Sequence, residues 1–329
     1  GVDSSGNFVQ QFEDLSTLAH NTTLHKLQLT EEAGSVLVFK DLAAPNRPGG
    51  FVSLTVPGGT TIAVTSESGN QILEVQRSLV VDGVTVTDSF LYEYTSASSS
   101  SSSFSSGVSS SSSSSGGSGP SAGQIQSCTY RRQTGSGGSW QNITRAVYSY
   151  YGSGDANGSQ DDLRTATRQT WQDTSGTWAD VGTDYYRYYS GHLLKYVCGP
   201  QAFANLSANT PDPFTASDAT VSLYADNYFQ YDINNRVTLE RVFAGSKTIN
   251  FAYTRNPRYP VGSSSSSSSS SSGSSSTPGF NVWIFKTTMT NPDNSQVVTY
   301  ANYAGQTMLS VLVESAPSSS SSSSGTAPD

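Results

Sequence analysis

The stretch of sequence that decides the fold is Tyr231-Asp232-Ile233-Asn234-Asn235-Arg236-Val237. It opens with an aromatic–aspartate pair, passes through an Asn-Asn step that tolerates a left-handed turn, and leaves on strand formers from Val237 onward. This pattern predicts two antiparallel strands joined by a tight turn. Looser copies recur elsewhere, so the sequence predicts a scaffold of repeated hairpins before it predicts an enzyme.

The copies align on their turn residues. Tyr188–Val197 carries an aromatic residue, a turn at Gly191 and then a strand, and Tyr300–Leu309 repeats this order around Gly305. The segment Thr65–Leu73 is a further copy without the tyrosine. One hairpin cannot bury its apolar face alone, whereas neighbouring hairpins form a continuous sheet. The residues predicted to build the repeat turns are Tyr231, Asp232, Asn235, Arg236, Gly191 and Gly305.

The composition favours strands with one wet face. Of the 329 residues, 34% are apolar and only 13% are charged, while tyrosine occurs 18 times. Tyrosine suits such strands because it packs an apolar ring and keeps a polar tip. The formal charge of −8 disfavours electrostatic binding to nucleic acid or to an anionic membrane. No apolar run approaches the roughly 20 residues of a membrane span, so we predict no membrane-spanning segment.

The clearest local signal for a hairpin is Leu79–Val86. Its Asp82-Gly83 pair lies between two alternating apolar runs and predicts a type I′ turn, in which both turn residues take positive φ. Helix is expected only at Gly199–Leu206, for one or two turns, and behind a capping box at Thr215–Asp218. Further strands are expected at residues 35–39, 51–56, 61–65, 124–132, 146–151, 164–172, 178–189, 236–243, 247–253, 282–289 and 296–300.

Pure serine runs divide the chain. They are either genuine flexible linkers or stretches whose residue identities are unassigned, and no chemistry is argued from them. We expect a β-hairpin region at 1–97, a Ser/Gly-rich linker at 98–123, a region of β-repeats at 124–261, a Ser-rich linker or insertion at 262–279, a C-terminal hairpin repeat at 280–315 and a Ser-rich tail at 316–329.

At these hairpins the chain resembles the YD-repeat, or RHS, family, and is most similar to the long secreted YD-repeat proteins of planctomycete-type bacteria. The likeness is carried by Leu194–Phe203, Ala219–Val237 and Asn291–Leu309. It covers residues 140–315, and 30–95 more loosely. The resemblance implies antiparallel hairpins that coil into an extended spiral sheet or shell, in secreted or cell-surface proteins that enclose a toxin or mediate adhesion. The chain lacks the Asp-Pro-x-Gly-Leu motif of the toxin-bearing members, which argues against toxin delivery by this segment.

Two features bear on bonds and metals. Cys128 and Cys198 both lie in strand-like sequence and are either buried thiols or a disulfide, which would contribute about 4 kcal/mol by closing a long loop. The loop from position 155 to 162 offers hard oxygen ligands around a turn glycine and is a candidate calcium site, with a polar hairpin loop as the alternative. Its proposed ligands are Asp155, Asn157, Asp161 and Asp162. No other cofactor is predicted.

Catalytic patterns are weak. His20 and His25 favour a surface loop over a metal site, and His192 stands where the repeat turn usually has an arginine, which indicates a structural role. No Gly-x-Ser-x-Gly elbow occurs in a strand–turn–helix context. A glycosidase would need two carboxylates about 5–9.5 Å apart across a groove, an arrangement that only the fold can provide.

The sequence therefore predicts an all-β, non-enzymatic structural protein that is secreted or displayed at the cell surface. Its expected partners are copies of itself or neighbouring repeats of a larger chain, within a shell, fibre or surface layer. The alternatives are an adhesin that binds surface glycan or a cell-surface partner, a segment of an RHS-type toxin-encapsulating shell, and a polysaccharide hydrolase.

Overall fold

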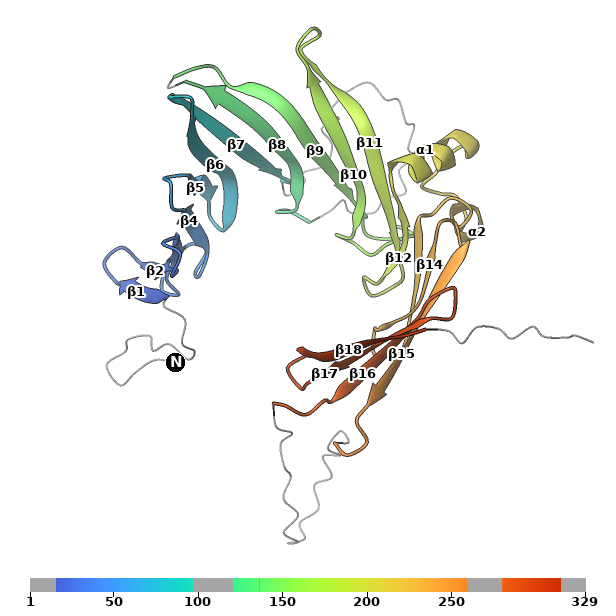
Figure 1. Ribbon diagram of the computed structural model, residues 1–329. Helices are drawn as coiled ribbons and strands as arrows, with labels where there is room; N and C mark the ends of the chain where they lie inside the picture. The colour runs from blue at the N-terminus through green and yellow to red at the C-terminus, as the bar shows by residue number, and fades with distance from the viewer. Residues whose placement is uncertain (1–15, 97–120, 136, 260–279, 315–329) are drawn as a thin grey trace, which may run out of the picture. The chain divides into compact units, whose positions relative to one another are not determined.

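The computed structural model describes residues 16–96, 121–135, 137–259 and 280–314 (Figure 1). Within these residues it contains eighteen strands and two helices, so the predicted all-β fold of consecutive antiparallel hairpins with minor helices is confirmed. The serine-rich segments predicted at 262–279 and 316–329 lie outside the described residues, as does most of the linker predicted at 98–123. The chain divides into two compact units, Gly1–His192 and Leu193–Asp329. The six predicted segments stay predictions.

The first unit is an antiparallel meander in which each strand pairs with the next one along the chain. Short strands come first and strands of eight to twelve residues follow from β5 onward. The strands are β1 (Thr17–Asn21), β2 (Lys26–Thr30), β3 (Val36–Lys40), β4 (Phe51–Thr55), β5 (Thr61–Ser68), β6 (Gln71–Val81), β7 (Val84–Tyr94), β8 (Ile125–Thr134), β9 (Gln141–Tyr150), β10 (Leu163–Gln172) and β11 (Thr177–Tyr188).

The second unit repeats this plan with shorter strands and carries both helices. Its strands also pair with their neighbours in sequence. They are β12 (Leu194–Cys198), β13 (Asn227–Tyr231), β14 (Val237–Val242), β15 (Lys247–Arg255), β16 (Phe285–Thr290), β17 (Gln296–Ala301) and β18 (Thr307–Val313). The helices α1 (Pro200–Asn209) and α2 (Asp218–Val221) lie between β12 and β13.

The helices begin where local chemistry places them, with one correction. α1 has Pro200 in its first turn, where the missing N–H has no helical partner to lose, and it buries Leu206. The cap of α2 is Ser217, whose Oγ accepts from the Thr220 N–H at 3.1 Å. The predicted capping box began at Thr215, but the Thr215 hydroxyl bonds to Asp212 instead, and α2 ends at Val221.

The tight turn at Asp82-Gly83 is confirmed. Asp82 has φ of 50° and Gly83 has φ of 78°, and the flanking Val81 and Val84 pair directly. Both turn residues are therefore left-handed, as a type I′ turn requires. This turn fixes the register of β6 against β7 along its whole length.

A different turn recurs through the rest of the chain. The Asp232 N–H donates to Arg236 O at 2.9 Å, the Asn235 N–H donates to Asp232 O at 3.0 Å, and Asn235 has φ of 60°. The same pair of bonds closes the turn from Asn302 to Gln306, where Gly305 has φ of 79°. Each loop has three residues between the two that close it, and the last of the three is left-handed and forms a bulge. The backbone pattern recurs at Glu31–Ser35, Val56–Thr60 and Asn291–Ser295.

The turn at Gly191 does not share this geometry. Gly191 and His192 are left-handed in succession, with φ of 85° and 67°. The prediction aligned Gly191 with Asn235 and Gly305, and it therefore grouped turns of two different geometries.

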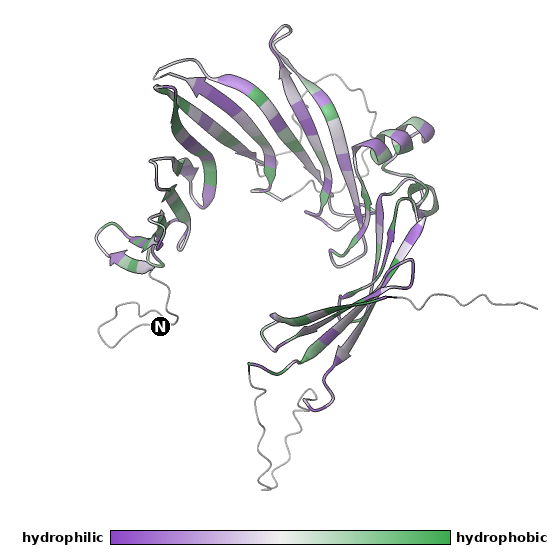
Figure 2. Cartoon of the chain, in the orientation of Figure 1, coloured by the Kyte–Doolittle hydropathy of each residue, from purple (hydrophilic) through white to green (hydrophobic). Residues whose placement is uncertain are grey.

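Most strands are half-exposed on both of their faces. Every residue of β3, β4 and β17 is half-exposed. A strand that packs one face on a core shows alternating buried and exposed residues instead. Hydrophilic and hydrophobic residues form bands across the strands (Figure 2). The described strands of each unit therefore leave both sheet faces open to contact.

Candidate functional site

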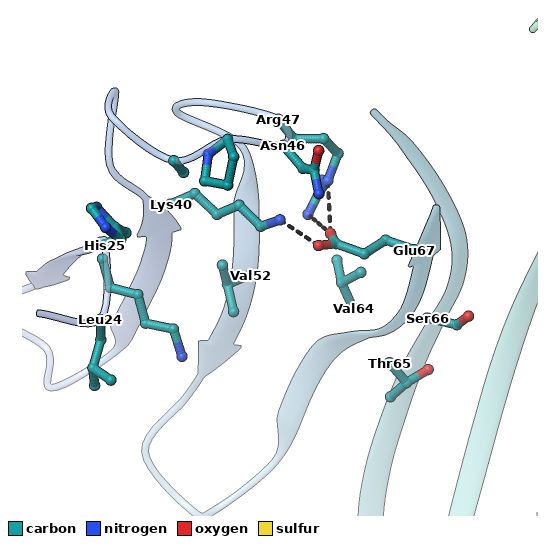
Figure 3. Close-up of a pocket in the computed structure, with 13 residues that line it drawn as sticks. Leu24, His25, Lys40, Asn46, Arg47, Val52, Val64, Thr65, Ser66 and Glu67 are labelled. Carbon is teal, nitrogen blue, oxygen red and sulfur yellow. Dashed lines mark hydrogen bonds and ion pairs between the residues drawn. The ribbon is translucent and has the colours of Figure 1, made fainter. Parts of the chain in front are cut away.

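The first unit contains a pocket of about 410 Å³ beside the loop that joins β3 to β4. Figure 3 shows Lys40 and Arg47 converging on Glu67 at its rim. The pocket is lined by Leu24, His25, Lys26, Lys40, Ala44, Pro45, Asn46, Arg47, Val52, Val64, Thr65, Ser66 and Glu67.

The carboxylate of this pocket is held in ion pairs. Arg47 reaches Glu67 Oε2 through Nε at 2.9 Å and Nη2 at 2.8 Å, and Lys40 bonds to Glu67 Oε1. The hydrogen bond from Lys40 lowers the pKa of Glu67, and the Arg47 bond lowers it further against the opposing effect of burial. Glu67 is therefore ionised near neutral pH and is poorly suited to donate a proton. Its visible role is to tie β5 to β3 and the loop.

A neighbouring carboxylate gathers two histidines. Asp41 Oδ2 lies 3.1 Å from His20 Nε2 and 3.2 Å from His25 Nδ1, while Asp41 Oδ1 accepts from the Ala43 N–H at 3.0 Å. Burial raises the pKa of Asp41, but the hydrogen bonds from His20 and His25 outweigh it and leave the pKa lowered. The sequence placed both histidines on a surface loop, whereas His20 lies on β1. Spacing along the chain gave no sign of Asp41 as their partner.

One face of the long strands β6 to β11 is built from polar side chains. Residues paired across neighbouring strands form a row on one side of the sheet. The row crosses five strands and runs through Glu74, Leu91, Thr129, Arg145 and Gln169. We call this side the polar face, defined by Glu74, Ser89, Thr129, Arg131, Arg145, Gln169, Asp180, Trp171 and Trp178.

Glu74 anchors one end of the polar face. Its Oε1 accepts from Ser89 Oγ at 2.6 Å and from Arg131 Nη2 at 2.9 Å, and its Oε2 accepts from Thr65 Oγ1 at 2.9 Å. Burial acts to raise the pKa of Glu74, but these hydrogen bonds prevail and hold it at about 2. Glu74 is consequently a fixed negative charge at neutral pH.

Tryptophans occupy the other end of the polar face. Trp171 and Trp178 pair across β10 and β11 with ring centroids 5.1 Å apart, and the Arg145 guanidinium carbon lies 4.7 Å from the Trp178 ring centroid. Gln169 bridges the row, since its amide nitrogen donates to Asp180 Oδ1 at 2.6 Å while its oxygen accepts from Arg145. Aromatic rings beside amide, carboxylate and guanidinium groups are suited to binding polar ligands with apolar patches.

A second carboxylate lies on the opposite side of the same strands. Asp88 is fully buried and accepts from Arg132 Nε at 2.8 Å and Tyr130 Oη at 2.9 Å, with Arg77 as a further partner. Burial acts to raise its pKa, but these donors hold it at about 2. Because side chains alternate along a strand, Asp88 and Glu74 face opposite sides of the sheet. These two carboxylates therefore cannot act together across one groove.

Each predicted calcium ligand is bonded to another group of the protein. Asp155 Oδ2 accepts from the Gly152 N–H at 2.8 Å, Asp161 accepts from the N–H and Oγ of Ser121 at 2.6 Å, and Asp162 Oδ1 lies 2.7 Å from His192 Nδ1. The carbonyl of Asn157 accepts from the Tyr188 N–H. In the described part of the chain, no group of three or more His, Cys, Asp or Glu residues is placed to hold a metal ion. The loop thus resembles the alternative, a polar hairpin loop.

The cysteines lie in different units, Cys128 on β8 and Cys198 on β12. Cys128 is a thiol in the structure. Burial raises the pKa of the Cys128 thiol, with a smaller opposing effect from its hydrogen bond to Tyr92. A raised thiol pKa disfavours the thiolate and with it nucleophilic chemistry at neutral pH.

The repeat-turn residues are engaged in building the turn. Asp232 Oδ1 accepts from the Asn234 and Arg236 N–H groups at 2.8 and 3.0 Å, and Asp232 Oδ2 pairs with the Arg236 side chain at 2.6 Å. Tyr231 Oη donates to Leu194 O at 2.8 Å, which ties the turn to β12. The side chains of Asp232 and Tyr231 thus hold the turn together and attach it to β12.

Comparison with protein-family models and with curated proteins gives no match. Among the described residues, neither helix is long and apolar enough to cross a membrane. The resemblance to YD-repeat proteins stays a prediction.

Proposed function

We propose that this chain is a structural scaffold without catalytic activity, a length of secreted, YD-repeat-like β-sheet that contributes to a shell, fibre or surface layer. Its partners are copies of itself or neighbouring repeats of a larger chain. The observation that carries the proposal is the half-exposure of both faces of strands in each unit, namely β3 and β4 in the first and β17 in the second. An isolated domain gains stability by burying one sheet face, so faces this open favour a sheet completed by further contacts.

The polar groups of the first unit support the same role. Glu67, Glu74 and Asp88 are each held by arginine side chains from other strands or loops. Each ion pair joins neighbouring parts of the meander, and each carboxylate is fixed as an anion that cannot donate a proton near neutral pH. Such groups stiffen a sheet and offer little to acid–base catalysis.

Electron microscopy of the purified full-length chain tests the scaffold proposal. We expect particles larger than one chain that contain continuous sheet. A uniform population of single chains at every protein concentration tried would contradict it. Screening the same preparation against polysaccharide substrates tests the absence of catalysis, and turnover that follows the purified chain would overturn that part.

A second candidate function, binding of surface glycan, is favoured by the tryptophan end of the polar face. Trp171 and Trp178 are half-exposed and lie beside Arg145, Gln169 and Asp180. Sugars bind proteins by stacking their apolar faces on aromatic rings while polar side chains bond to hydroxyls. A glycan array comparing the natural chain with Trp178→Ala is expected to show ligands that the variant loses. Equal binding by both proteins, or none by the natural chain, would exclude this site.

A further inference from the structure

Strand β18 is largely apolar, and none of its residues is buried. All seven of its residues, Thr307–Val313, are exposed, and they include no charged residue and no proline. Its large apolar side chains are 38% to 64% exposed, namely Met308, Leu309, Val311, Leu312 and Val313. Charges and prolines, which β18 lacks, are among the features that protect exposed edge strands, whose unpaired backbone groups recruit other strands.

The pairing of β18 leaves one of its edges open. It pairs with β17 from Leu309 to Val313, opposite Tyr300 to Gln296, and again at Thr307 opposite Ala301, with a bulge at Met308. Its other edge makes no pairing among the described strands. Alternate backbone N–H and C=O groups along that edge therefore point away from the sheet. A further antiparallel strand would satisfy them and cover the apolar side chains on both faces.

The sequence of β18 is close to a palindrome in polarity. About Ser310 at the centre, Leu309 mirrors Val311 and Met308 mirrors Leu312. Two copies in antiparallel register centred on Ser310 would thus place apolar residues opposite apolar residues on both faces. From Leu309 to Val311, residues whose backbone groups point outward meet residues that also point outward in this register, since their mirror positions differ by an even number. The strand is complementary to itself.

Strand β1, the first of the described strands, is not matched in this way. Strand β1 has one large apolar residue, Leu18, and its His20 and Asn21 side chains bond to Asp41 and to the Leu24 N–H. Pairing of β1 with β18 of another copy would place these polar groups against apolar ones. A closed two-fold contact through β18 is therefore favoured over an open head-to-tail chain.

We infer that β18 is a self-association edge, at which a second copy of this chain adds its own β18 in antiparallel register centred on Ser310. The contact joins two sheets into one. It rests on the proposed scaffold function and names the surface through which copies of the scaffold meet.

Charge-swapped variants of the full-length chain test the register. In the proposed pairing, position 309 of one copy lies opposite position 311 of the other, and both positions lie in the regular part of β18. Leu309→Lys with Val311→Lys places like charges opposite each other, whereas Leu309→Glu with Val311→Lys places opposite charges there. Sedimentation equilibrium across protein concentration gives the dissociation constant of each protein, and circular dichroism checks that each retains its strands.

We expect the natural chain to be dimeric, the double-lysine variant to dissociate about 30-fold more readily, and the Glu/Lys variant to recover to within about tenfold of the natural chain. Equal weakening by both variants would overturn the register, because only this pairing brings the two positions together. A natural chain that stays monomeric up to about 100 μM would overturn the inference outright. If both variants formed the same assemblies as the natural chain in electron micrographs, β18 self-pairing would be contradicted and the scaffold proposal would not.

Discussion

Strands β7 and β18 invert the usual relation between polarity and burial. In β7 the fully buried residues are the polar Asp88 and Ser89. In β18 the residues are largely apolar and all are exposed. The difference comes from place in the ladder, since β7 has partners on both sides while β18 has only β17 among the described strands. A neighbour on each side can bury even polar residues, and charge is tolerated there when its partners come with it.

Acidification is expected to have the largest effect on this comparison, because it discharges Asp88 of β7 and Glu74, whose carboxylate accepts from Ser89 of β7. The pKa values of Glu74 and Asp88 are about 2, below their ordinary values of 4.5 and 3.8. Their contribution is therefore complete above about pH 4.5 and is lost as pH falls through about 2. Urea titrations at pH 7, 4 and 2.5 should show the free energy of unfolding of the first unit falling below pH 4.5, and a flat profile would contradict the network.

Removal of one buried charge is the next largest effect. Asp88→Ala leaves Arg132 and Arg77 without their carboxylate and should lower the free energy of unfolding by about 3 kcal/mol at pH 7. Thr85→Ala on the same strand is the control, because Thr85 is exposed. Denaturant titration of the three proteins gives the values. Equal free energies of unfolding for Asp88→Ala and the control would show that the buried Asp88 makes no net contribution to stability.

The turn that delivers β18 should show a smaller effect. The buried Asn302 accepts from the Ala304 and Gln306 N–H groups at 3.0 Å, so Asn302→Ala should cost about 2 kcal/mol. Asp232→Ala removes the same bonds from a more exposed turn and should cost less. Hydrogen exchange on β17 and β13 measures each loss locally. A larger loss at Asp232 would show that the exposed ion pair to Arg236, and not burial of the capping side chain, fixes these turns.

The smallest effect is expected on the exposed strand itself. Leu312→Ser removes a side chain that is 64% exposed, so the stability of the monomer should change by no more than about 0.5 kcal/mol. Measurement belongs at dilutions where the chain is monomeric, since association adds stability of its own. A loss above about 1 kcal/mol would mean that Leu312 is covered within one chain.

Much of the local structure could be predicted from the sequence. The type I′ turn at Asp82-Gly83 and the helix after Gly199 lie where their residues place them. These signals act over a few residues, through left-handed φ, capping and the fixed φ of proline. The capping box was misplaced because serine and threonine at neighbouring positions offer equivalent hydroxyls, and Asp212 engaged that of Thr215.

The candidate site was beyond the reach of sequence reasoning. Arg131 bonds to Glu74 across 57 residues, and Asp41 gathers His20 from a distance of 21. The acidic loop at 155–162 looked like a cation site because its ligands are close in sequence, yet Ser121 and His192 take two of its carboxylates from outside the loop. No spacing rule indicates such partners, because strand register sets them.

The sequence by itself determined that this chain forms consecutive hairpins, since alternation and turn chemistry are local properties of the backbone. Only the tertiary structure decided which charges are buried, which rows share a face and which strand is left with an open edge. Those properties depend on what lies beside each strand, and pairing between distant residues supplies the neighbours. Asp88 and Leu312 show the result, with a buried charge in the interior of the sheet and an exposed leucine at its edge.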